Sequence, residues 1–175
     1  MSEVSIHLLM GENCDEIFQF EVENRKFFES IIPGRGEWYY TKENFKEITQ
    51  EIIEEQELGI RYMYIIRNND GDMVGRINLF SVDRGIFQKA ELGYRIGQKY
   101  NRRGYATKAV KLVLEEAFEK HKLHRVEAAT SPNNIGSQIV LIKNGFQFVG
   151  RAHKHINVNG IWNDSVFFER LNSHG

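Results

Sequence analysis

Short runs of this chain alternate apolar and polar residues, and longer runs repeat apolar residues with the period of a helix. The clearest succession covers residues 91–118. Leu92, Tyr94 and Ile96 alternate with polar or small residues, which is typical of a strand that buries one face. Beyond a basic turn, apolar residues recur at Ala106, Ala109, Val110, Val113, Leu114, Ala117 and Phe118. This spacing predicts an amphipathic helix lying on a sheet.

Upstream of this succession, the pattern predicts a first strand and two helices. Residues 4–9 form a short apolar run. Asn13 and Glu16 have the spacing of a capping box, which predicts a helix that begins at Asn13. Thr41 is a suitable N-cap residue for a second helix.

A hairpin then leads into the strand of the central succession. Residues 61–67 and 73–82 are rich in strand-forming residues and are joined by a turn that contains Asp70-Gly71. A second connection returns to a strand over residues 90–97. The sequence thus predicts three antiparallel strands that lead into the basic turn and its helix.

Downstream of the long helix, the chain predicts a strand, a short helix and a closing hairpin. The strand covers residues 123–130, and the helix covers 133–144 with Gly145 at its C-terminal end. The hairpin pairs residues 147–158 with 161–171. This order indicates one α/β (α+β) domain over residues 1–175, with an ordered core at about 4–171 and a mixed, mostly antiparallel sheet of about seven strands.

Composition narrows the function classes. The chain has 175 residues, a net charge of −1 and a single cysteine, Cys14. The charge gives no basis for a nucleic-acid or membrane-surface partner. No stretch is long and apolar enough to span a membrane, and the N-terminus lacks the features of a signal peptide. One cysteine excludes an internal disulfide, so we expect a cytoplasmic protein.

The basic turn has the features of an anion site. Arg102, Arg103 and Gly104 precede the helix, whose N-terminus carries free amides and the positive end of the helix dipole. At Gly104 a Cβ atom would hold a phosphate away from the backbone, and Ala106 is small for the same reason. Alternatively, Gly104 only forms a tight turn and the arginines are solvated.

At these residues the sequence resembles the GNAT superfamily of N-acetyltransferases. The acetyl-CoA loop of that family matches Asn101-x-x-Gly104-x-Ala106 except at its first position. The resemblance implies the GNAT fold, with helices on both faces of the sheet and a splayed central strand pair. It also implies that acetyl-CoA is bound by the edge of the strand before the loop, by the loop, and by a downstream asparagine. The implied residues are Arg95, Ile96, Gly97, Arg102, Arg103, Gly104, Tyr105, Ala106, Thr107 and Asn134.

Ser137 is the candidate proton donor. With Asn134 as the N-cap, Ser137 stands at the third position of the short helix. Acetyl transfer from a thioester expels a thiolate, which a nearby hydroxyl and the positive end of the helix dipole would stabilise. Alternatively, Ser137 only helps to cap the helix.

This stretch resembles the RimJ/RimL-type branch, which acetylates the N-termini of ribosomal proteins. Asn134, Ser137 and the Asn144-Gly145-Phe146 helix end match the pattern of that branch. Many other superfamily members use a tyrosine where this chain has Leu141, so the resemblance implies that Ser137 takes over its role. The branch further implies a protein N-terminus as the acceptor, and homodimers are common among similar proteins.

Glu91 is the candidate general base. It lies on the strand that leads to the cofactor loop, although a salt bridge or a plain sheet-face position is an equal alternative. A free α-amine needs little help, because it is neutral for roughly a tenth of the time at pH 7, whereas a lysine is neutral for well under a thousandth. His153 and His155 lack ligand spacing with a partner, so we expect no metal site.

Two further features bear on the acceptor. Trp38, Tyr39 and Tyr40 can line an acceptor pocket or pack in the core. The second predicted helix carries acids that can attract a cationic acceptor or form a solvated face, namely Glu47, Glu51, Glu54, Glu55 and Glu57.

These observations predict an acetyl-CoA-dependent N-acetyltransferase that transfers directly in a ternary complex, most simply to a protein N-terminus. Small amines, such as polyamines, amino sugars or antibiotics, are the alternative acceptors. A non-catalytic acyl-CoA-binding module is the alternative class.

Overall fold

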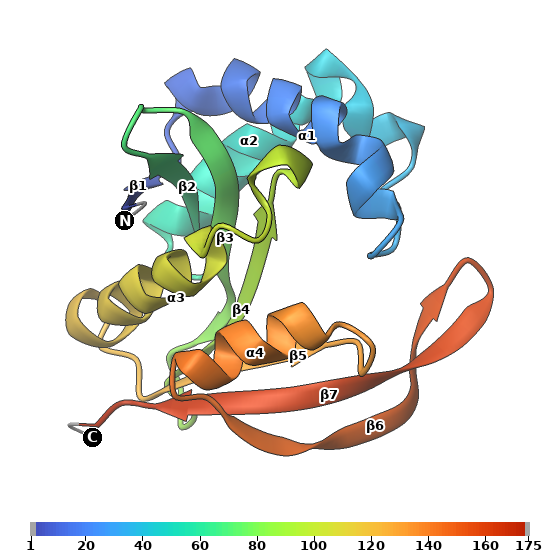
Figure 1. Ribbon diagram of the computed structural model, residues 1–175. Helices are drawn as coiled ribbons and strands as arrows, with labels where there is room; N and C mark the ends of the chain where they lie inside the picture. The colour runs from blue at the N-terminus through green and yellow to red at the C-terminus, as the bar shows by residue number, and fades with distance from the viewer. Residues whose placement is uncertain (1–2, 174–175) are drawn as a thin grey trace.

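A computed structural model describes residues 3–173, which form a seven-stranded sheet with helices on both faces (Figure 1). The strands are β1 (Val4–Leu8), β2 (Tyr62–Asn68), β3 (Met73–Asp83), β4 (Lys89–Ile96), β5 (Arg125–Thr130), β6 (Gln147–Val158) and β7 (Ile161–Leu171). The α-helices are α1 (Cys14–Glu29), α2 (Lys42–Glu57), α3 (Tyr105–Glu115) and α4 (Ile135–Lys143).

The strand order is β1-β2-β3-β4-β5-β7-β6. Only the central pair, β4 and β5, is parallel, and α3 makes the crossover between these two strands. All other neighbours are antiparallel. The predicted mixed, mostly antiparallel sheet is therefore confirmed, as are the β2–β3 and β6–β7 hairpins.

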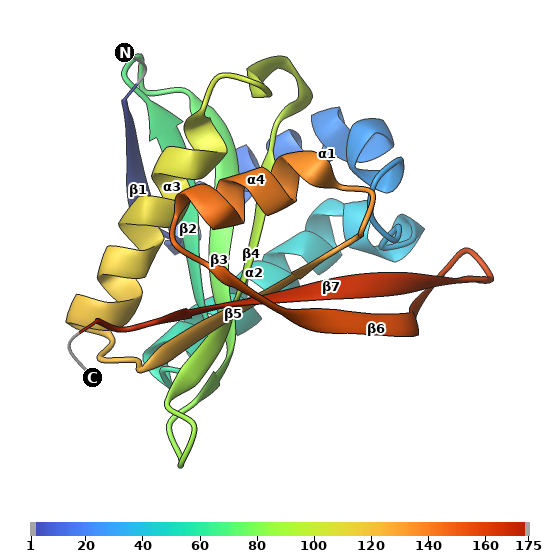
Figure 2. The ribbon, with the colours of Figure 1, turned by 60° about the horizontal axis from the view of Figure 1, so that its bottom comes forward.

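Two hydrophobic cores hold the layers together, one on each face of the sheet. α3 and α4 cover one face, and α1 and α2 cover the other (Figure 2). Val110 and Val113 of α3 pack in the first core, with Ile77 of β3. Phe28 of α1 and Ile65 of β2 pack in the second core.

β4 contributes side chains to both faces because of its two-residue alternation. Leu92 and Ile96 are buried in the core under α3, and Tyr94 packs against that core. The intervening residues, Gly93 and Arg95 among them, therefore face α1 and α2. This alternation decides on which side of the sheet each candidate residue lies.

The first two helices begin where the sequence predicts, but the predicted capping hydrogen bonds are absent. Asn13 occupies the N-cap position of α1, but its side chain accepts a hydrogen bond from the Met10 amide and none from the helix. Glu16 forms an ion pair with Arg67 of β2, with an N–O distance of 2.6 Å, instead of closing a capping box. Thr41 occupies the N-cap position of α2, but its hydroxyl donates to the Trp38 carbonyl. In each case the side chain bonds to a residue outside the helix instead of capping the helix.

α3 is shorter than the apolar pattern predicts. It ends at Glu115 and continues as a π-helical turn, Glu116–Lys120. The next residue, His121, stacks on Tyr62 at 3.6 Å between ring centroids, and its Nε2 lies 2.8 Å from the Tyr64 hydroxyl. Burial lowers the pKa of His121 to about 4, against a weaker opposing effect of Glu116. The turn therefore packs a neutral imidazole against the edge of the core.

Candidate active site

The predicted splay between β4 and β5 is present in the structure. The two strands pair from Lys89 with Arg125 to Glu91 with Glu127. Beyond this point β4 continues to Ile96 and β5 continues to Thr130, but the two strands no longer pair with each other. The Gly97 amide donates to Val74 of β3, so strand alternation directs the backbone groups of Tyr94 and Ile96 toward the gap. These groups form the edge that could bind an extended chain.

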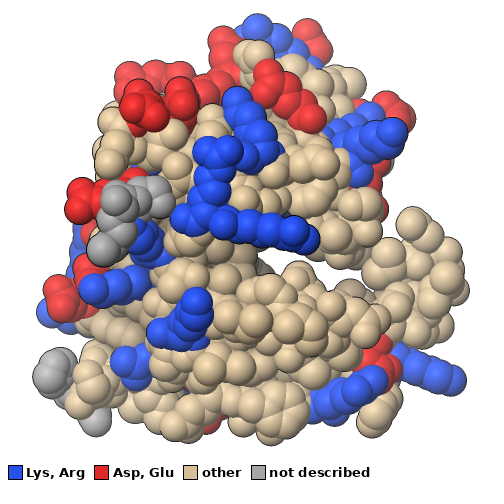
Figure 3. Space-filling model, in the orientation of Figure 1, with Lys and Arg blue, Asp and Glu red and all other residues tan. Residues whose placement is uncertain are grey.

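The basic turn follows directly on this edge. A 3₁₀ turn, η3 (Gln98–Tyr100), leads to Gly104, which has φ of +79° and is the N-cap of α3. A Cβ atom added at Gly104 would meet no protein atom within 4 Å, so the space in front of it is open. Figure 3 shows lysine and arginine side chains gathered over this part of the molecule. The open cradle, the amides of the first turn of α3 and the basic side chains fit a pyrophosphate.

Two of the predicted cofactor residues can contribute only through their backbone. The side chains of Ile96 and Tyr105 are buried in the core under α3. Asn144, at the end of α4, donates to the carbonyl of Thr107 at 3.1 Å and thereby ties α4 to the start of α3. The two helices that flank the gap are thus fixed relative to each other.

Ser137 lies in the first turn of α4, as predicted. The side chain of Asn134 is the N-cap and accepts a hydrogen bond from the Ser137 amide at 3.1 Å. Leu141 is almost completely buried in the core, so the position of the missing tyrosine does not face the gap. Ser137, rather than residue 141, is therefore the candidate proton donor on α4.

Tyr94 reaches the same place from β4, and sequence reasoning missed it. Its hydroxyl lies 3.0 Å from Ser137 Oγ, so a hydrogen bond joins β4 to α4 across the gap. Burial raises the pKa of Tyr94, which therefore keeps its proton at neutral pH. In the sequence, Tyr94 belongs to an alternating apolar set and is therefore interpreted as a core residue.

Glu91 lies at the last paired position of β4, on the face of α1 and α2. It forms no ion pair or side-chain hydrogen bond with any residue in the range 3–173. Its neighbour on β5, Glu127, is held by Lys89 and Arg125, each at 2.7 Å. Glu91 therefore does not form the salt bridge considered as an alternative, and its carboxylate is free of side-chain partners among residues 3–173. It could accept a proton.

Arg95 has a side-chain partner that the sequence does not predict. Its Nη1 atom donates to Glu21 of α1 at 2.9 Å, and Arg76 of β3 pairs with the other oxygen of the same carboxylate. The backbone groups of Arg95 point toward β3, where Arg95 pairs with Arg76, so the splayed edge is formed by its neighbours Tyr94 and Ile96. The Arg95 side chain points to the face of α1 and α2. Glu21 is difficult to recognise in the sequence because α1 carries acids on several sides.

The aromatic run before α2 divides between the two predicted roles. Tyr39 is buried and packs edge-on against Phe45 of α2. Trp38 is exposed, and Tyr40 lies under the Arg25 guanidinium, whose carbon is 4.1 Å from the ring centroid. Arg25 also bonds to Glu37, so this loop is fastened to α1 by charge and by ring contacts.

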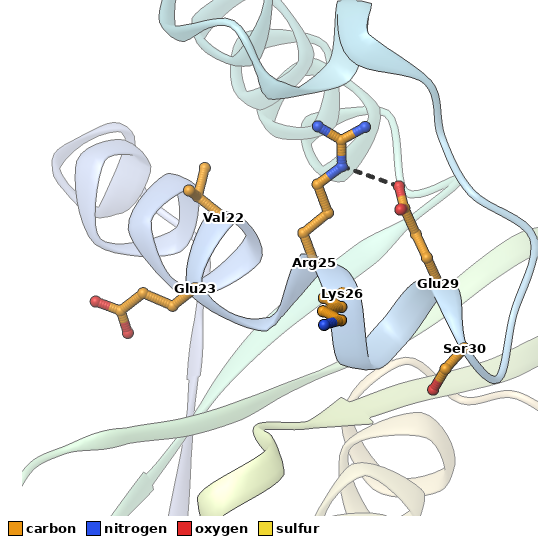
Figure 4. Close-up of a pocket in the computed structure, with 6 residues that line it drawn as sticks. All are labelled: Val22, Glu23, Arg25, Lys26, Glu29 and Ser30. Atoms are coloured by element: carbon orange, nitrogen blue, oxygen red, sulfur yellow. Dashed lines mark hydrogen bonds and ion pairs between the residues drawn. The ribbon is translucent and has the colours of Figure 1, made fainter.

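A shallow pocket lies on α1 itself, lined by Val22, Glu23, Arg25, Lys26, Glu29 and Ser30 (Figure 4). The Arg25–Glu29 ion pair, at 3.0 Å, spans its upper side. None of the predicted site residues lines it. A separate hollow is visible in Figure 3. It lies between the loop above α3 and the lower half of the molecule, which contains α4 and the β6–β7 hairpin.

The described part of the chain contains neither a group of metal-binding side chains nor a membrane-spanning helix. Within residues 3–173, no group of His, Cys, Asp or Glu side chains could hold a metal ion. His153 pairs with Asp164 at 3.0 Å, and His155 lies 2.9 Å from the Ser165 hydroxyl. No helix formed by these residues is long and apolar enough to span a membrane.

Comparisons with known proteins agree with this geometry. The sequence matches the family described as "Acetyltransferase (GNAT) domain" over residues 12–147. It is 37% identical over 161 residues to "Probable N-acetyltransferase YjcK" of Bacillus subtilis (strain 168), covering 91% of this chain and 89% of that protein. It is 25% identical over 162 residues to "[Ribosomal protein uS5]-alanine N-acetyltransferase" of Escherichia coli (strain K12), covering 92% and 84%.

The fold is also found among solved structures. The crystal structure of ribosomal-protein-S5-alanine acetyltransferase from Vibrio fischeri superposes with a TM-score of 0.92 at 24% sequence identity. The superposition covers 99% of this chain and 97% of that chain. The whole described sheet and its helices therefore have a counterpart in a known fold.

Proposed function

Since the chain belongs to the GNAT family of N-acetyltransferases, which use acetyl-CoA, we propose that its acceptor is the α-amine of a protein N-terminus. The E. coli relative, named for alanine acetylation of ribosomal protein uS5, supports this acceptor. The geometry of the splayed gap supports direct transfer, with cofactor and acceptor approaching β4 from its two sides.

The cofactor would be held by the residues around the gap. Gly104 and the first amides of α3 would hold the pyrophosphate, and Asn134 would hold the lower arm. The pantetheine would bond to the β4 edge through the backbone of Tyr94 and Ile96, rather than through Arg95 and Gly97, whose backbone groups point to β3. When bound, acetyl-CoA supplies an activated acetyl group as a thioester. The remaining tasks, which are proton transfer and orientation, belong to the protein.

Ser137 would provide the proton that the leaving sulfur requires. Its hydroxyl is fixed at 3.0 Å from the Tyr94 hydroxyl. When Ser137 donates toward the sulfur, Tyr94 can donate to Ser137 Oγ, which strengthens Ser137 as a donor. Since burial raises the pKa of Tyr94, this second proton is retained at neutral pH.

Glu91 would accept the proton of the attacking amine, directly or through water. Its carboxylate has no partner among residues 3–173, and it lies on the face opposite Ser137. The proton acceptor and the proton donor would therefore lie on the two faces of one strand, the acceptor near the attacking amine and the donor near the leaving sulfur.

The observation that carries the proposed transfer is the Tyr94–Ser137 hydrogen bond at the splay, opposite Glu91, which has no side-chain partner among residues 3–173. The test is an acceptor screen with thiol release as the readout. Peptides that begin with alanine or serine should be acetylated at the α-amine, and the same peptides with a blocked N-terminus should not. Turnover with polyamines, amino sugars or antibiotics alone would refute the proposed acceptor. CoA binding without any turnover would point to a non-catalytic binding module.

A further inference from the structure

The turn that leads into the cofactor loop is capped by a side chain from another element. This turn is η3, and the amide of its first residue, Gln98, has no partner inside the turn, because the first amides of a helical turn precede its hydrogen bonds. Gly97 occupies the N-cap position and has no side chain to cap with. Instead, Asn24 of α1 accepts the hydrogen bond from the Gln98 amide through Oδ1, at 2.9 Å. The chain between β4 and α3 lies beside α1 in Figures 1 and 2.

A side chain at position 97 could not take the place of Asn24. A Cβ atom added at Gly97 would lie 3.1 Å from the Phe20 ring and 3.4 Å from Asn24 Oδ1. α1 therefore packs directly on the backbone at this point, and the cap has to come from the helix. The Asn24 amide group is also oriented for this role. Its nitrogen donates to the Phe20 carbonyl at 2.9 Å, which leaves Oδ1 to accept from Gln98.

The segment of α1 that carries Asn24 is held firmly against the sheet. Glu21 stands three residues before Asn24 and therefore on the same face of the helix. It is fully buried and pairs with Arg76 of β3 at 2.6 Å and with Arg95 of β4 at 2.9 Å. Phe20 packs in the core between the sheet and these first helices. Asn24 is thus presented to η3 by a fixed part of α1.

The loop beyond η3 needs support because part of its backbone is strained. Arg102 has φ of +62°, in the left-handed region that residues other than glycine seldom adopt. Strain of this kind persists only where the surrounding structure holds it. Tyr100 and Tyr105 are buried and meet edge-on with ring centroids 6.2 Å apart, so they hold the two ends of the loop together. The Asn24 cap fixes the other end of η3, where the chain leaves β4.

We propose that Asn24 is a positioning residue of the cofactor site. Its bond to the Gln98 amide would keep the loop from Asn101 to Gly104 in the conformation that receives the pyrophosphate of CoA. The inference rests on the proposed function, which assigns this loop to the cofactor. Without the bond, only a fraction of the molecules would hold the loop ready, and the apparent affinity for CoA would fall by that fraction.

The test measures CoA binding to the purified protein by isothermal titration calorimetry. Asn24→Leu replaces the amide by an apolar group of nearly the same shape, and leucine favours a helix. Since a capping bond changes an equilibrium about 3–30-fold, Kd for CoA should rise by about this factor. The KM for acetyl-CoA should rise as well. In contrast, kcat at saturating acetyl-CoA and the KM for the peptide acceptor should stay within about twofold, because the lost interaction concerns cofactor binding alone.

A measurement without cofactor isolates the bond itself. In the CoA-free protein, NMR should show that the Gln98 amide exchanges with solvent about 3–30-fold faster in Asn24→Leu than in wild type. Asn24→Asp keeps an oxygen for this amide and loses only the nitrogen that bonds to Phe20. It should restore slow exchange and bring Kd for CoA to within about threefold of wild type. Asn24→Ala, which removes the same oxygen, is the second variant if Asn24→Leu does not fold.

Asn13 provides a matched control at the other end of the same helix. Its Oδ1 atom accepts from the Met10 amide at 2.9 Å, which is the same kind of bond at the same distance. Asn13 lies about 16 Å from Asn24 along the helix. Asn13→Leu should therefore lower the melting temperature but leave Kd for CoA within about twofold of wild type.

The outcomes separate the inference from the proposed function. A wild-type Kd in Asn24→Leu, or an equal loss of affinity in Asn13→Leu, would overturn the role of Asn24. An Asn24→Asp protein that binds CoA no better than Asn24→Leu would also overturn it. Unchanged CoA binding in Gly104→Val would remove the loop from the cofactor site, and the inference with it. Turnover of polyamines alone would overturn only the proposed acceptor, since CoA binding reports on Asn24 independently.

Discussion

The hydrogen bond between Tyr94 and Ser137 makes a quantitative prediction. Tyr94→Phe removes one hydroxyl and keeps the ring in place. A neutral hydrogen bond contributes about 1 kcal/mol, and a bond whose acceptor gains charge contributes about 1.5–3 kcal/mol. The bond of 3.0 Å should strengthen in this way as Ser137 gives up its proton. The difference of about 0.5–2 kcal/mol corresponds to a fall in kcat of about 2–30-fold.

The assay is steady-state kinetics with the true acceptor, together with CoA titration. Ser137→Ala should lower kcat about 10²–10⁴-fold, because positioned acid catalysis is lost. Both variants should bind CoA nearly as tightly as wild type, since the interaction belongs to the transition state. Single-turnover measurements must show that chemistry limits the rate.

The double variant tests whether Tyr94 acts through Ser137. If it does, Tyr94→Phe should cost less than about twofold in a Ser137→Ala background, so the two effects are not additive. An undiminished cost in that background would show that Tyr94 acts elsewhere, by packing or by contacting substrate itself. A kcat of Tyr94→Phe within twofold of wild type would refute the relay altogether.

Three further results are expected. Gly104→Val should abolish CoA binding, measured as a lost rise in melting temperature, whereas Gly160→Val, which has the same left-handed backbone strain at the β6–β7 turn, should keep it. Glu91→Gln should lower kcat/KM for the acceptor about tenfold or more at neutral pH, and an unchanged value would remove Glu91 as the base. The folded pKa of His121, about 4, lies below its unfolded value of about 6.5, so the free energy of unfolding should fall as pH drops below about 6.5. That dependence should shrink in His121→Gln, and a chemical-denaturation series at several pH values measures it.

The sequence predicts the elements well because their signals are local. Alternation in β4, the helical period of α3 and the Asp70-Gly71 turn each depend on neighbouring residues. The cap of α4 is predicted for the same reason, since Asn134 and Ser137 are three residues apart and bond directly. Asn13 and Thr41 stand at the predicted N-cap positions but make no capping bond, because their side chains bond to Met10 and Trp38, outside the helices.

The site is only partly predictable because its remaining members meet across the fold. Tyr94 and Ser137 are 43 positions apart, and Glu21 and Arg95 are 74 positions apart. Tyr94 has the apolar spacing of a core residue, and Glu21 is one acid among several on α1. No periodicity distinguishes these residues, since their function arises from the strand pairing that brings them together.

The alternation of β4 also makes the two halves of the proposed reaction separately variable. Tyr94 faces the cofactor side, and Glu91, the proposed base, lies on the opposite face of the same strand. Descendants of this protein could therefore acquire a new acceptor by changing alternate residues, without altering the proton donor. A single inserted residue in β4 would have the opposite effect, because it would exchange the two faces and disable both halves at once. This strand can thus evolve by point substitution but not by a change of length.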